Sequence, residues 1–474
     1  MDGYDAVATS TRVSDLRRNY LSFMDTLAQS IANIAPTLTP TLNITLVAAN
    51  AGMGTWFVYL LTTVGLVLVG MNISVFARRF AASGSMYTYV TRGLGATAGF
   101  LSGWGLLAAY LFTAMATLVA FAVYVNQILA YFGTKAPSIL LYAVGGVAIW
   151  YLAYKDIKFS SMLALFLEFV SVSLIAAMGF IVLAGTGFHI DTAQFSLQGV
   201  TLSGLNLAMV LAVFSFVGFE SATALGKESR NPFRTIPRAV IMSTIVVGLF
   251  FALMSYIEVV GFGSPSALTN SEAPMNDLAA KYHVGWFALL IDLGASISFF
   301  SCALASTNAA SRIMYAMGRD KIFHESIGRA HLRNQTPHNA VTVCSIMNFI
   351  VPTLMVGIKP MDAYGYLGTS ATYGFLLAYI LISIATTVYL VREGQLKLYH
   401  ALLSAGGVLV MMVPLIGSFY PVPSFPYNMF PYMFVLYLFV GIIWFRRVAS
   451  QNPASLKQVA MDFDANEEMI FSRK

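Results

Sequence analysis

The chain has 474 residues, of which 58% are hydrophobic and 10% are charged, and its mean hydropathy is +0.72. Apolar runs longer than about 18 residues recur from end to end, which excludes a soluble globular protein and predicts a chain that crosses a membrane many times. The net charge of +6 gives no reason to expect nucleic acid as a partner, because Lys and Arg in such a chain usually record which loops stay in the cytoplasm.

Charged residues are spread through residues 1–20, so we expect no cleavable signal peptide and a cytoplasmic N-terminal segment. The first span is then its own insertion signal. A window of about 19 residues predicts twelve spans, with ends uncertain by several residues. They run about 21–48, 53–76, 96–128, 138–153, 160–184, 203–226, 238–261, 284–316, 340–358, 364–390, 401–419 and 429–446.

The orientation follows from the basic residues. With the N-terminus in the cytoplasm, all but three of the 27 Lys and Arg residues fall on the inner side, and the exceptions are Lys135, Lys281 and Lys359. Such an imbalance over short loops is a strong positive-inside signal. We therefore expect a multi-pass protein of the plasma membrane with both termini in the cytoplasm.

The first predicted span is interrupted by "SIANIAPTLTPTLN". Pro36 and Pro40 lie four residues apart, with Thr37, Thr39 and Thr41 between and beside them. Backbone that leaves helical geometry at membrane depth has to line a cavity or be buried in protein, because lipid offers its amide and carbonyl groups no partner. A single proline is usually a harmless kink, but this cluster favours a functional break.

The sixth predicted span has a matching weak point in "FSFVGFESATALGKESRNP", where Gly218 lies among aromatic residues and polar Ser215 and Glu220 are close by. Spans one and six begin on opposite sides of the membrane, so each is the first of five spans in one half of an inverted repeat. Interruptions at corresponding positions of two such halves indicate a transporter site near the bilayer midplane.

Three segments resemble the amino acid, polyamine and organocation permeases. They are "RRFAASGSMYTYVTRGLG" from 78 to 95, "FSFVGFESATALGKESRNPFRTIPRA" from 214 to 239, and "ASTNAASRIMYAMGRD" from 305 to 320. The resemblance implies the leucine-transporter fold, an all-α membrane architecture, and secondary active transport by alternating access. It implies a ten-helix core over 21–390, with repeats 21–184 and 203–390, then peripheral helices over 401–446 and a cytoplasmic tail over 447–474.

The resemblance also suggests binding residues. Family members that carry α-amino acids commonly have a small glycine-rich triplet at the first break, whose amides receive the substrate carboxylate. The aligned residues here are Ala35, Pro36 and Thr37. Proline has no amide hydrogen, so one expected donor is missing, although the hydroxyls of Thr37 and Thr39 could replace it.

On the sixth span, Phe214 matches an aromatic residue that stacks on substrate and closes the outer side in similar permeases. Carbonyl groups near Phe214, Ser215 and Phe216, together with Glu220, could receive an ammonium group, with Gly218 at the break. The alternative is that the two phenylalanines only pack in the bundle.

Acidic residues within spans are expensive unless they are paired, hydrated or functional. Glu220 could order the break, bind an amine or accept a coupling proton. Glu168 could be a proton site or could bond a neighbouring helix. Asp292 could belong to an outer gate or to a hydrated helix end. We expect Glu258 to be solvated at the outer surface.

Asp25 lies near the inner end of the first span. We expect it to belong to an inner gate or to pair with Arg17 or Arg18.

The coupling ion has two candidates. Proton-coupled relatives often hold a lysine in span five, but the corresponding position is near Ser171. Either sodium binds between the first break and hydroxyls such as Ser301 or Ser306, or protons couple through Glu168 or Glu220. We favour protons.

The expected substrate is an amino acid or a small amine. Ala109 stands where polyamine importers can carry a carboxylate, before Tyr110, which could pack against a ligand. A dication would need a second buried acid, and only Glu168 is near enough in depth. A polyamine or organic cation importer and an amino acid or amine exchanger remain alternatives, and a channel or a transporter-derived sensor is a remote one.

The sequence contains no constellation typical of an enzyme. The six histidines lie in loops or at predicted helix ends and form no HxxxH-type pair. Cys302 and Cys344 lie in apolar stretches without metal-ligand spacing, so we interpret both as packing residues. No cofactor or metal is expected, and the oligomeric state stays open.

Overall fold

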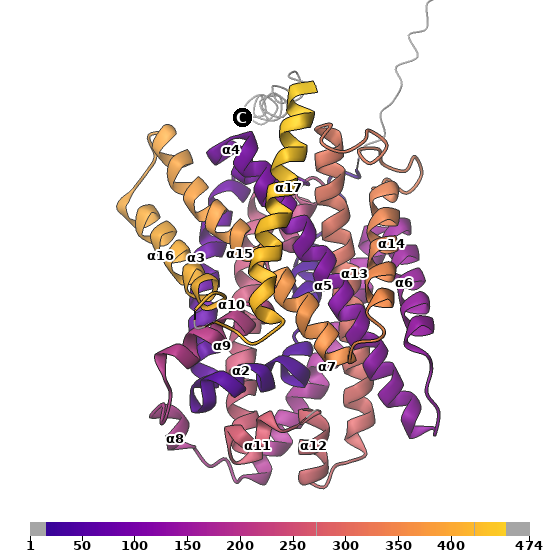
Figure 1. Ribbon diagram of the computed structural model, residues 1–474, viewed down its shortest axis with the longest axis vertical. Helices are drawn as coiled ribbons and strands as arrows, with labels where there is room; N and C mark the ends of the chain where they lie inside the picture. The colour runs from indigo at the N-terminus through magenta and orange to yellow at the C-terminus, as the bar shows by residue number, and fades with distance from the viewer. Residues whose placement is uncertain (1–15, 272, 421, 452–474) are drawn as a thin grey trace, which may run out of the picture.

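The computed structural model describes residues 16–271, 273–420 and 422–451, and Figure 1 shows them as a bundle of long helices. Within these ranges the only strand-like pairing is an isolated parallel bridge between Leu21 and Ser229. The fold is therefore all-α, as the sequence predicts.

The first half of the chain begins with a broken helix, made of α1, η1 and α2. The elements of this half are α1 (Phe23–Ile34), the π-helical turn η1 (Thr39–Asn43), α2 (Ile44–Ala51), the 3-10 turn η2 (Gly52–Gly54), α3 (Thr55–Ala77), α4 (Met86–Leu94), α5 (Ala96–Tyr131), α6 (Ser138–Lys155) and α7 (Ile157–Gly185).

The second half begins with a second broken helix. It consists of the short α8 (Thr192–Phe195), α9 (Leu202–Ser215), the 3-10 turn η3 (Ser221–Leu225), α10 (Pro232–Phe262), α11 (Pro265–Thr269), α12 (Pro274–Lys281), α13 (Phe287–Arg319), α14 (His338–Leu354) and α15 (Pro360–Arg392). It is followed by α16 (Leu398–Gly417), the 3-10 turn η4 (Tyr427–Met429) and α17 (Phe430–Gln451).

Each of the twelve predicted ranges coincides with a helix or a broken helix. Among the described residues, nine helical runs are long and apolar enough to cross a membrane, with 23–77 counted as one run, and two shorter apolar helices are α9 and α14. The architecture of long apolar helices is thus confirmed, whereas the number of crossings and the repeat symmetry stay predictions.

Local sequence explains where several helices begin. The side chains of Ser22, Asp156 and Thr201 each accept a hydrogen bond from a backbone amide in the first turn of α1, α7 and α9. Such N-caps satisfy amides that have no partner within the helix, and each typically stabilises a helix by about 1 kcal/mol.

The centre of the bundle lies along α5, which packs against α13 and α15. In the most apolar stretch of α5, 83% of the residues are buried, whereas the share is 28% for α16 and 17% for the run that contains α17. Figure 1 shows α16 at the left edge of the bundle and α17 in front of it. We call the end that carries residues 16–22 and the end of α17 the termini end, and the end that carries α8, α11 and α12 the opposite end.

Close contact between α5 and α15 depends on a glycine. A Cβ atom added to Gly374 would lie 2.2 Å from the carbonyl oxygen of Gly105 and 2.9 Å from Cβ of Ala109. Both neighbours are fixed to helix backbone, so a side chain at position 374 would force the helices apart.

We predict that Gly374→Ala lowers the thermal unfolding midpoint of the detergent-solubilised protein, because overpacking usually costs about 1–3 kcal/mol. Gly146→Ala on α6 is the matched control, since a Cβ there meets nothing within 4 Å and the gain in helix propensity is the same. Equal midpoints for the two variants would contradict the close α5–α15 packing.

Candidate functional site

The first break lies between α1 and η1. Ala35 adopts the left-handed conformation, with φ 51° and ψ 72°, and its amide donates to the carbonyl of Ile31 at 3.1 Å. Pro36 has no amide hydrogen. Two of the three amides expected to receive a carboxylate are therefore engaged or missing, which leaves that of Thr37.

Threonine side chains at this break are buried without partners. Thr37 and Thr39 are both 0% exposed, and within the described ranges neither hydroxyl has a hydrogen-bond partner. A buried hydroxyl without a partner is unfavourable by roughly 1–3 kcal/mol. These two hydroxyls are available to a ligand, as the sequence interpretation requires.

The second break lies between α9 and η3 and touches the first. Gly218 has φ +93°, and a Cβ atom there would lie 2.3 Å from Nδ2 of Asn33 on α1. Any other residue would be strained by its backbone conformation and would collide with α1. The glycine therefore lets the two breaks meet.

Hydrogen bonds join the two broken helices directly. The hydroxyl of Ser30 donates to the carbonyl of Phe219 at 2.7 Å and accepts from the amide of Ala222 at 3.2 Å. The hydroxyl of Ser221 donates to the carbonyl of Gln29 at 3.1 Å. Polar groups freed at the second break are thus satisfied by α1 rather than by lipid.

Helix α13 approaches the same place. The hydroxyl of Ser306 donates to Oδ1 of Asn33 at 2.5 Å, and the thiol of Cys302 donates to the backbone carbonyl of Asn33 at 3.1 Å. Ser306 thus faces α1, as the sodium hypothesis requires, but its hydroxyl is used by Asn33. Ser301 is buried, and its hydroxyl has no partner among the described residues.

Glu220 is held by two tyrosines. Its Oε1 accepts the hydroxyl of Tyr110 on α5 at 2.6 Å, and its Oε2 accepts the hydroxyl of Tyr379 on α15 at 2.7 Å. All three side chains are at most 1% exposed. Tyr110, which could pack against a ligand or be structural, joins α5 to the second break. Sequence analysis missed Tyr379, since nothing local distinguishes it from other tyrosines of α15.

A second polar cluster surrounds Ser215. Its hydroxyl accepts from Nδ2 of Asn43 at 3.1 Å and lies 3.2 Å from the hydroxyl of Tyr59, while Tyr364 donates to Oδ1 of Asn43 at 3.1 Å. Elements α3, η1, α9 and α15 are joined here. Sequence analysis named only Ser215 among these residues.

Two aromatic residues, Phe214 and Phe216, pack at the end of α9 beside the second break. Phe214 is 9% exposed; its ring packs against Gly368, where a Cβ would lie 2.6 Å from it, and its centroid is 6.0 Å from that of Tyr364. Phe216 is fully buried against Phe251, with ring centroids 5.1 Å apart. The site is thus enclosed in this conformation.

Two of the carbonyl groups that could receive an ammonium group already accept hydrogen bonds in local turns. The carbonyls of Phe214 and Phe216 accept the amides of Val217 and Phe219, each at 3.2 Å. A ligand would have to share these oxygens.

Glu168 on α7 lies in a polar cluster beside α13. Its side chain is 0% exposed, and within the described part of the chain neither oxygen has a hydrogen-bond partner. The hydroxyl of Ser298 faces it but lies outside standard hydrogen-bond geometry. Ser298 belongs to α13, so the alternative that Glu168 bonds a neighbouring helix stays a prediction beside that of a proton site.

Ser171 points to a different neighbour. Its hydroxyl donates to the carbonyl of Gly294 on α13 at 2.7 Å and to that of Leu167 at 2.9 Å. This position joins α7 to α13.

The structure changes one expectation for each of three acidic residues, while an inner gate at Asp25 and an outer gate at Asp292 stay predictions. Asp25 accepts the amide and hydroxyl of Ser22, both at 2.8 Å, as a helix cap, whereas Arg17 binds Asp156 at 3.3 Å. Asp292 is buried and accepts Nδ2 of Asn276 at 2.9 Å, so it is no hydrated helix end. Glu258 is 0% exposed, so the expectation that it is solvated is wrong.

The termini end is closed by a buried ion pair. Arg312 on α13 donates to both oxygens of Glu228, at 2.7 and 3.0 Å, and both side chains are 1% exposed. The backbone of residue 228 in turn accepts the amides of Tyr20 and Leu21 at 2.8 and 2.9 Å. Sequence analysis used Arg312 only as a marker of orientation.

Tyr20 strengthens this closure. Its hydroxyl donates to Asp156 at 3.2 Å, and the guanidinium of Arg17 lies 4.6 Å from the centre of its ring. Partial burial and the Asp156 carboxylate raise the pKa of Tyr20 above its usual value. The hydroxyl therefore stays a neutral donor.

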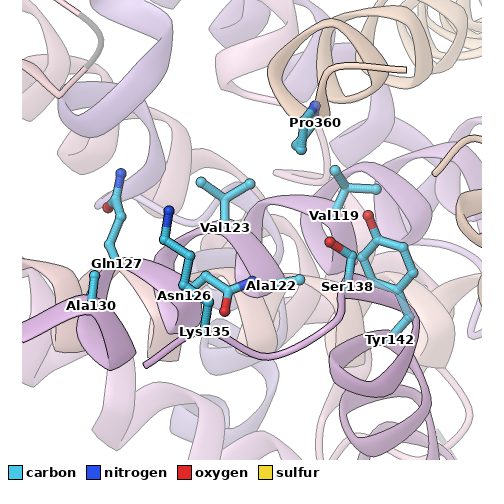
Figure 2. Close-up of a pocket in the computed structure, with 10 residues that line it drawn as sticks. All are labelled: Val119, Ala122, Val123, Asn126, Gln127, Ala130, Lys135, Ser138, Tyr142 and Pro360. Carbon is cyan, nitrogen blue, oxygen red and sulfur yellow. The ribbon is translucent and has the colours of Figure 1, made fainter. Parts of the chain in front are cut away.

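A cavity of about 300 Å³ lies apart from the breaks, at the opposite end. Figure 2 shows it between the end of α5, the start of α6 and Pro360. None of the predicted site residues lines it. Its lining comprises Val119, Ala122, Val123, Asn126, Gln127, Ala130, Lys135, Ser138, Tyr142 and Pro360.

Two touching breaks, buried between long apolar helices and lined by hydroxyl groups without partners, define a membrane transporter. A family model described as "Amino acid permease" matches residues 25–450, so the chain belongs to the amino acid permease family, with the leucine-transporter fold.

Curated relatives are transporters. The branched-chain amino acid permease BcaP of Bacillus subtilis is 25% identical over 365 residues, covering 74% of this chain and 76% of that protein. The low-affinity putrescine importer PlaP of Escherichia coli is 24% identical over 336 residues, covering 67% and 72%.

Solved structures support the fold alone. A Na⁺-coupled sialic acid symporter in a substrate-bound outward-open state has a TM-score of 0.53 at 12% identity, covering 83% of this chain and 90% of that one. A manganese transporter of Eremococcus coleocola has a TM-score of 0.57 at 10% identity, covering 92% and 94%.

We predict that Glu228→Gln destabilises the closed termini end by roughly 3–5 kcal/mol, because it leaves the Arg312 charge buried and uncompensated. The thermal unfolding midpoint measures this loss. Glu325→Gln is the matched control. The side chains of Glu325 and Arg329 form an ion pair but are 70% and 62% exposed, and such surface pairs contribute little to stability. A midpoint for Glu228→Gln equal to that of the control would contradict the assigned pair.

Proposed function

We propose that the protein is a secondary active transporter that takes up a neutral amino acid with an apolar side chain across the plasma membrane by alternating access. The observation that carries this proposal is the contact of the two breaks at Gly218 and Asn33, beside the buried hydroxyls of Thr37 and Thr39. The substrate carboxylate would bind the amide of Thr37 and these hydroxyls, near the positive end of the following helix.

The enclosure of the site supports an apolar side chain on the substrate. Phe214 and Tyr364 are buried next to the second break, and aromatic rings favour apolar groups. The likeness to a branched-chain amino acid permease supports the same class of substrate.

A polyamine is the second candidate. The likeness to a putrescine importer and the unpartnered carboxyl of Glu168 favour it. Against it, both oxygens of Glu220 already accept tyrosine hydroxyls, so the second break offers a dication no free carboxylate.

We propose that Glu168 carries the coupling proton. An ionised carboxylate that is buried without a partner is unfavourable by several kcal/mol, so Glu168 is neutral in the enclosed conformation. It would release the proton where the site opens to the cytoplasm, which the excess of Lys and Arg assigns to the termini end.

Uptake into proteoliposomes tests the substrate class. A panel of labelled leucine, alanine, arginine and putrescine is offered with a proton gradient and a sodium gradient imposed separately. We expect proton-driven accumulation of leucine. Accumulation of putrescine and of no amino acid would contradict the proposed substrate and favour a polyamine importer. An ohmic current without counterflow exchange would contradict a carrier and indicate a channel.

We predict that Thr37→Val reduces leucine uptake at least tenfold, because one lost hydrogen bond to a charged group is worth about 1.5–3 kcal/mol. Thr62→Val on α3 is the matched control, because its hydroxyl is also buried without a partner among the described residues. Equal uptake by the two variants would remove Thr37 from the site.

Glu168→Gln is expected to abolish proton-driven accumulation of leucine while counterflow exchange of labelled leucine continues, because the amide mimics the protonated side chain. Full accumulation by this variant would contradict the assignment of the coupling proton to Glu168.

A further inference from the structure

A further buried carboxyl, that of Glu258, lies outside both breaks. Glu258 is on α10, one turn before the helix ends at Phe262, near the opposite end. Its side chain is 0% exposed, and neither of its oxygens has a hydrogen-bond partner in the ranges that the structure describes. No function discussed above uses this group.

The neighbouring tyrosines leave Glu258 without a donor. Glu258 interacts electrostatically with Tyr59 on α3 and Tyr124 on α5. The hydroxyl of Tyr59 is engaged with Ser215 at 3.2 Å, and that of Tyr124 donates to the carbonyl of Thr41 in η1 at 3.3 Å. Both hydroxyls are therefore directed towards the broken helices.

The charged groups on the surrounding elements also have other partners. Lys281 on α12 donates to the carbonyls of Gly261 and Phe262, at 2.7 and 3.2 Å. Asp292 on α13, the other acid near Tyr124, accepts from Asn276. Asp277 on α12 is exposed and accepts the hydroxyl of Ser271 at 2.5 Å.

The helices α11 and α12 both pack against α10 near its end. Leu268 and Leu278 are fully buried, and a Cβ atom on Gly261 would lie 2.8 Å from Leu278. Figure 1 shows α11 and α12 at the opposite end, beyond the end of α10. Together with Lys281, this cover separates Glu258 from water in the enclosed conformation.

Burial then determines the charge state. An ionised carboxylate without a partner is strongly disfavoured at this depth, whereas the same group in water is ionised at neutral pH. A sodium ion is the alternative partner for an ionised carboxylate here, and the infrared experiment below separates it from a proton.

We propose that Glu258 is a proton-binding site that takes up one proton from solution when the opposite end closes and releases it when that end opens. This proposal rests on the proposed alternating access, but it concerns a site separate from Glu168. Closing the site around substrate would then bind a proton at Glu258 as well as at Glu168.

Infrared spectroscopy tests the charge state without any substrate. Protein in liposomes is followed across a pH series in sodium-free buffer, and the carbonyl band of protonated carboxyl groups is recorded. We expect Glu258→Gln to remove one component that is present at neutral pH in the wild type, and Glu258→Asp to restore a component. Asp277→Asn is the control, since it removes an exposed acid from the covering segment.

Leucine binding tests the coupling. Lower pH should strengthen binding to the wild type, and Glu258→Gln should flatten this dependence by up to about tenfold per pH unit, which corresponds to one proton. Glu168→Gln should flatten it independently. A pH dependence unchanged by Glu258→Gln would overturn the proposal.

The outcomes separate the two proposals. Failure of leucine to bind would contradict the proposed substrate, while the infrared band would still decide the state of Glu258. An unchanged band in Glu258→Gln, or a band that sodium removes at constant ionic strength, would overturn the proton site.

Discussion

Contact between the two interrupted helices is the constraint on which the rest of the structure depends. A helix that breaks within a membrane exposes amide and carbonyl groups that lipid cannot satisfy. Here the groups freed around Phe219 and Ala222 are satisfied by Ser30 of α1, and the absence of a side chain at Gly218 allows Asn33 to approach. Neither break would be stable alone, so the two form a single unit.

The polar groups around this unit fall into two kinds. Some have partners on other helices, such as Glu220 with Tyr110 and Tyr379, and they fix the arrangement of α5, α15 and the second break. Others are buried without partners among the described residues, such as Thr37 and Glu168. Groups of the second kind are unfavourable in the enclosed conformation unless something binds them, which is why they are the candidates for substrate and proton.

Sequence reasoning succeeded where the signal was local. Pro36 and Pro40 lie close together among threonines, and Gly218 among aromatic residues marks a weak point, so both breaks were predicted from local sequence. The resemblance to permeases gave the family. Long apolar windows placed the helices, because burial in lipid depends on composition over a short range of sequence.

Sequence reasoning failed where the partner or the burial of a side chain depends on residues distant in the chain. The partners of Glu220 come from positions 110 and 379, and no local pattern pairs them. Arg312 was read as a topology marker because its partner Glu228 lies 84 positions away. Glu258 was expected in water because its depth was judged without the α11–α12 cover.

The measurement that tests the central claim most directly is the accessibility of the first break to a membrane-impermeant thiol reagent in a Thr37→Cys variant that still binds leucine. The native Cys302 and Cys344 are replaced by alanine in this variant, so labelling reports on position 37. If the breaks form the substrate site, the reagent labels this cysteine from one side and leucine protects it. Labelling that leucine leaves unchanged, at concentrations that saturate transport, would contradict the account.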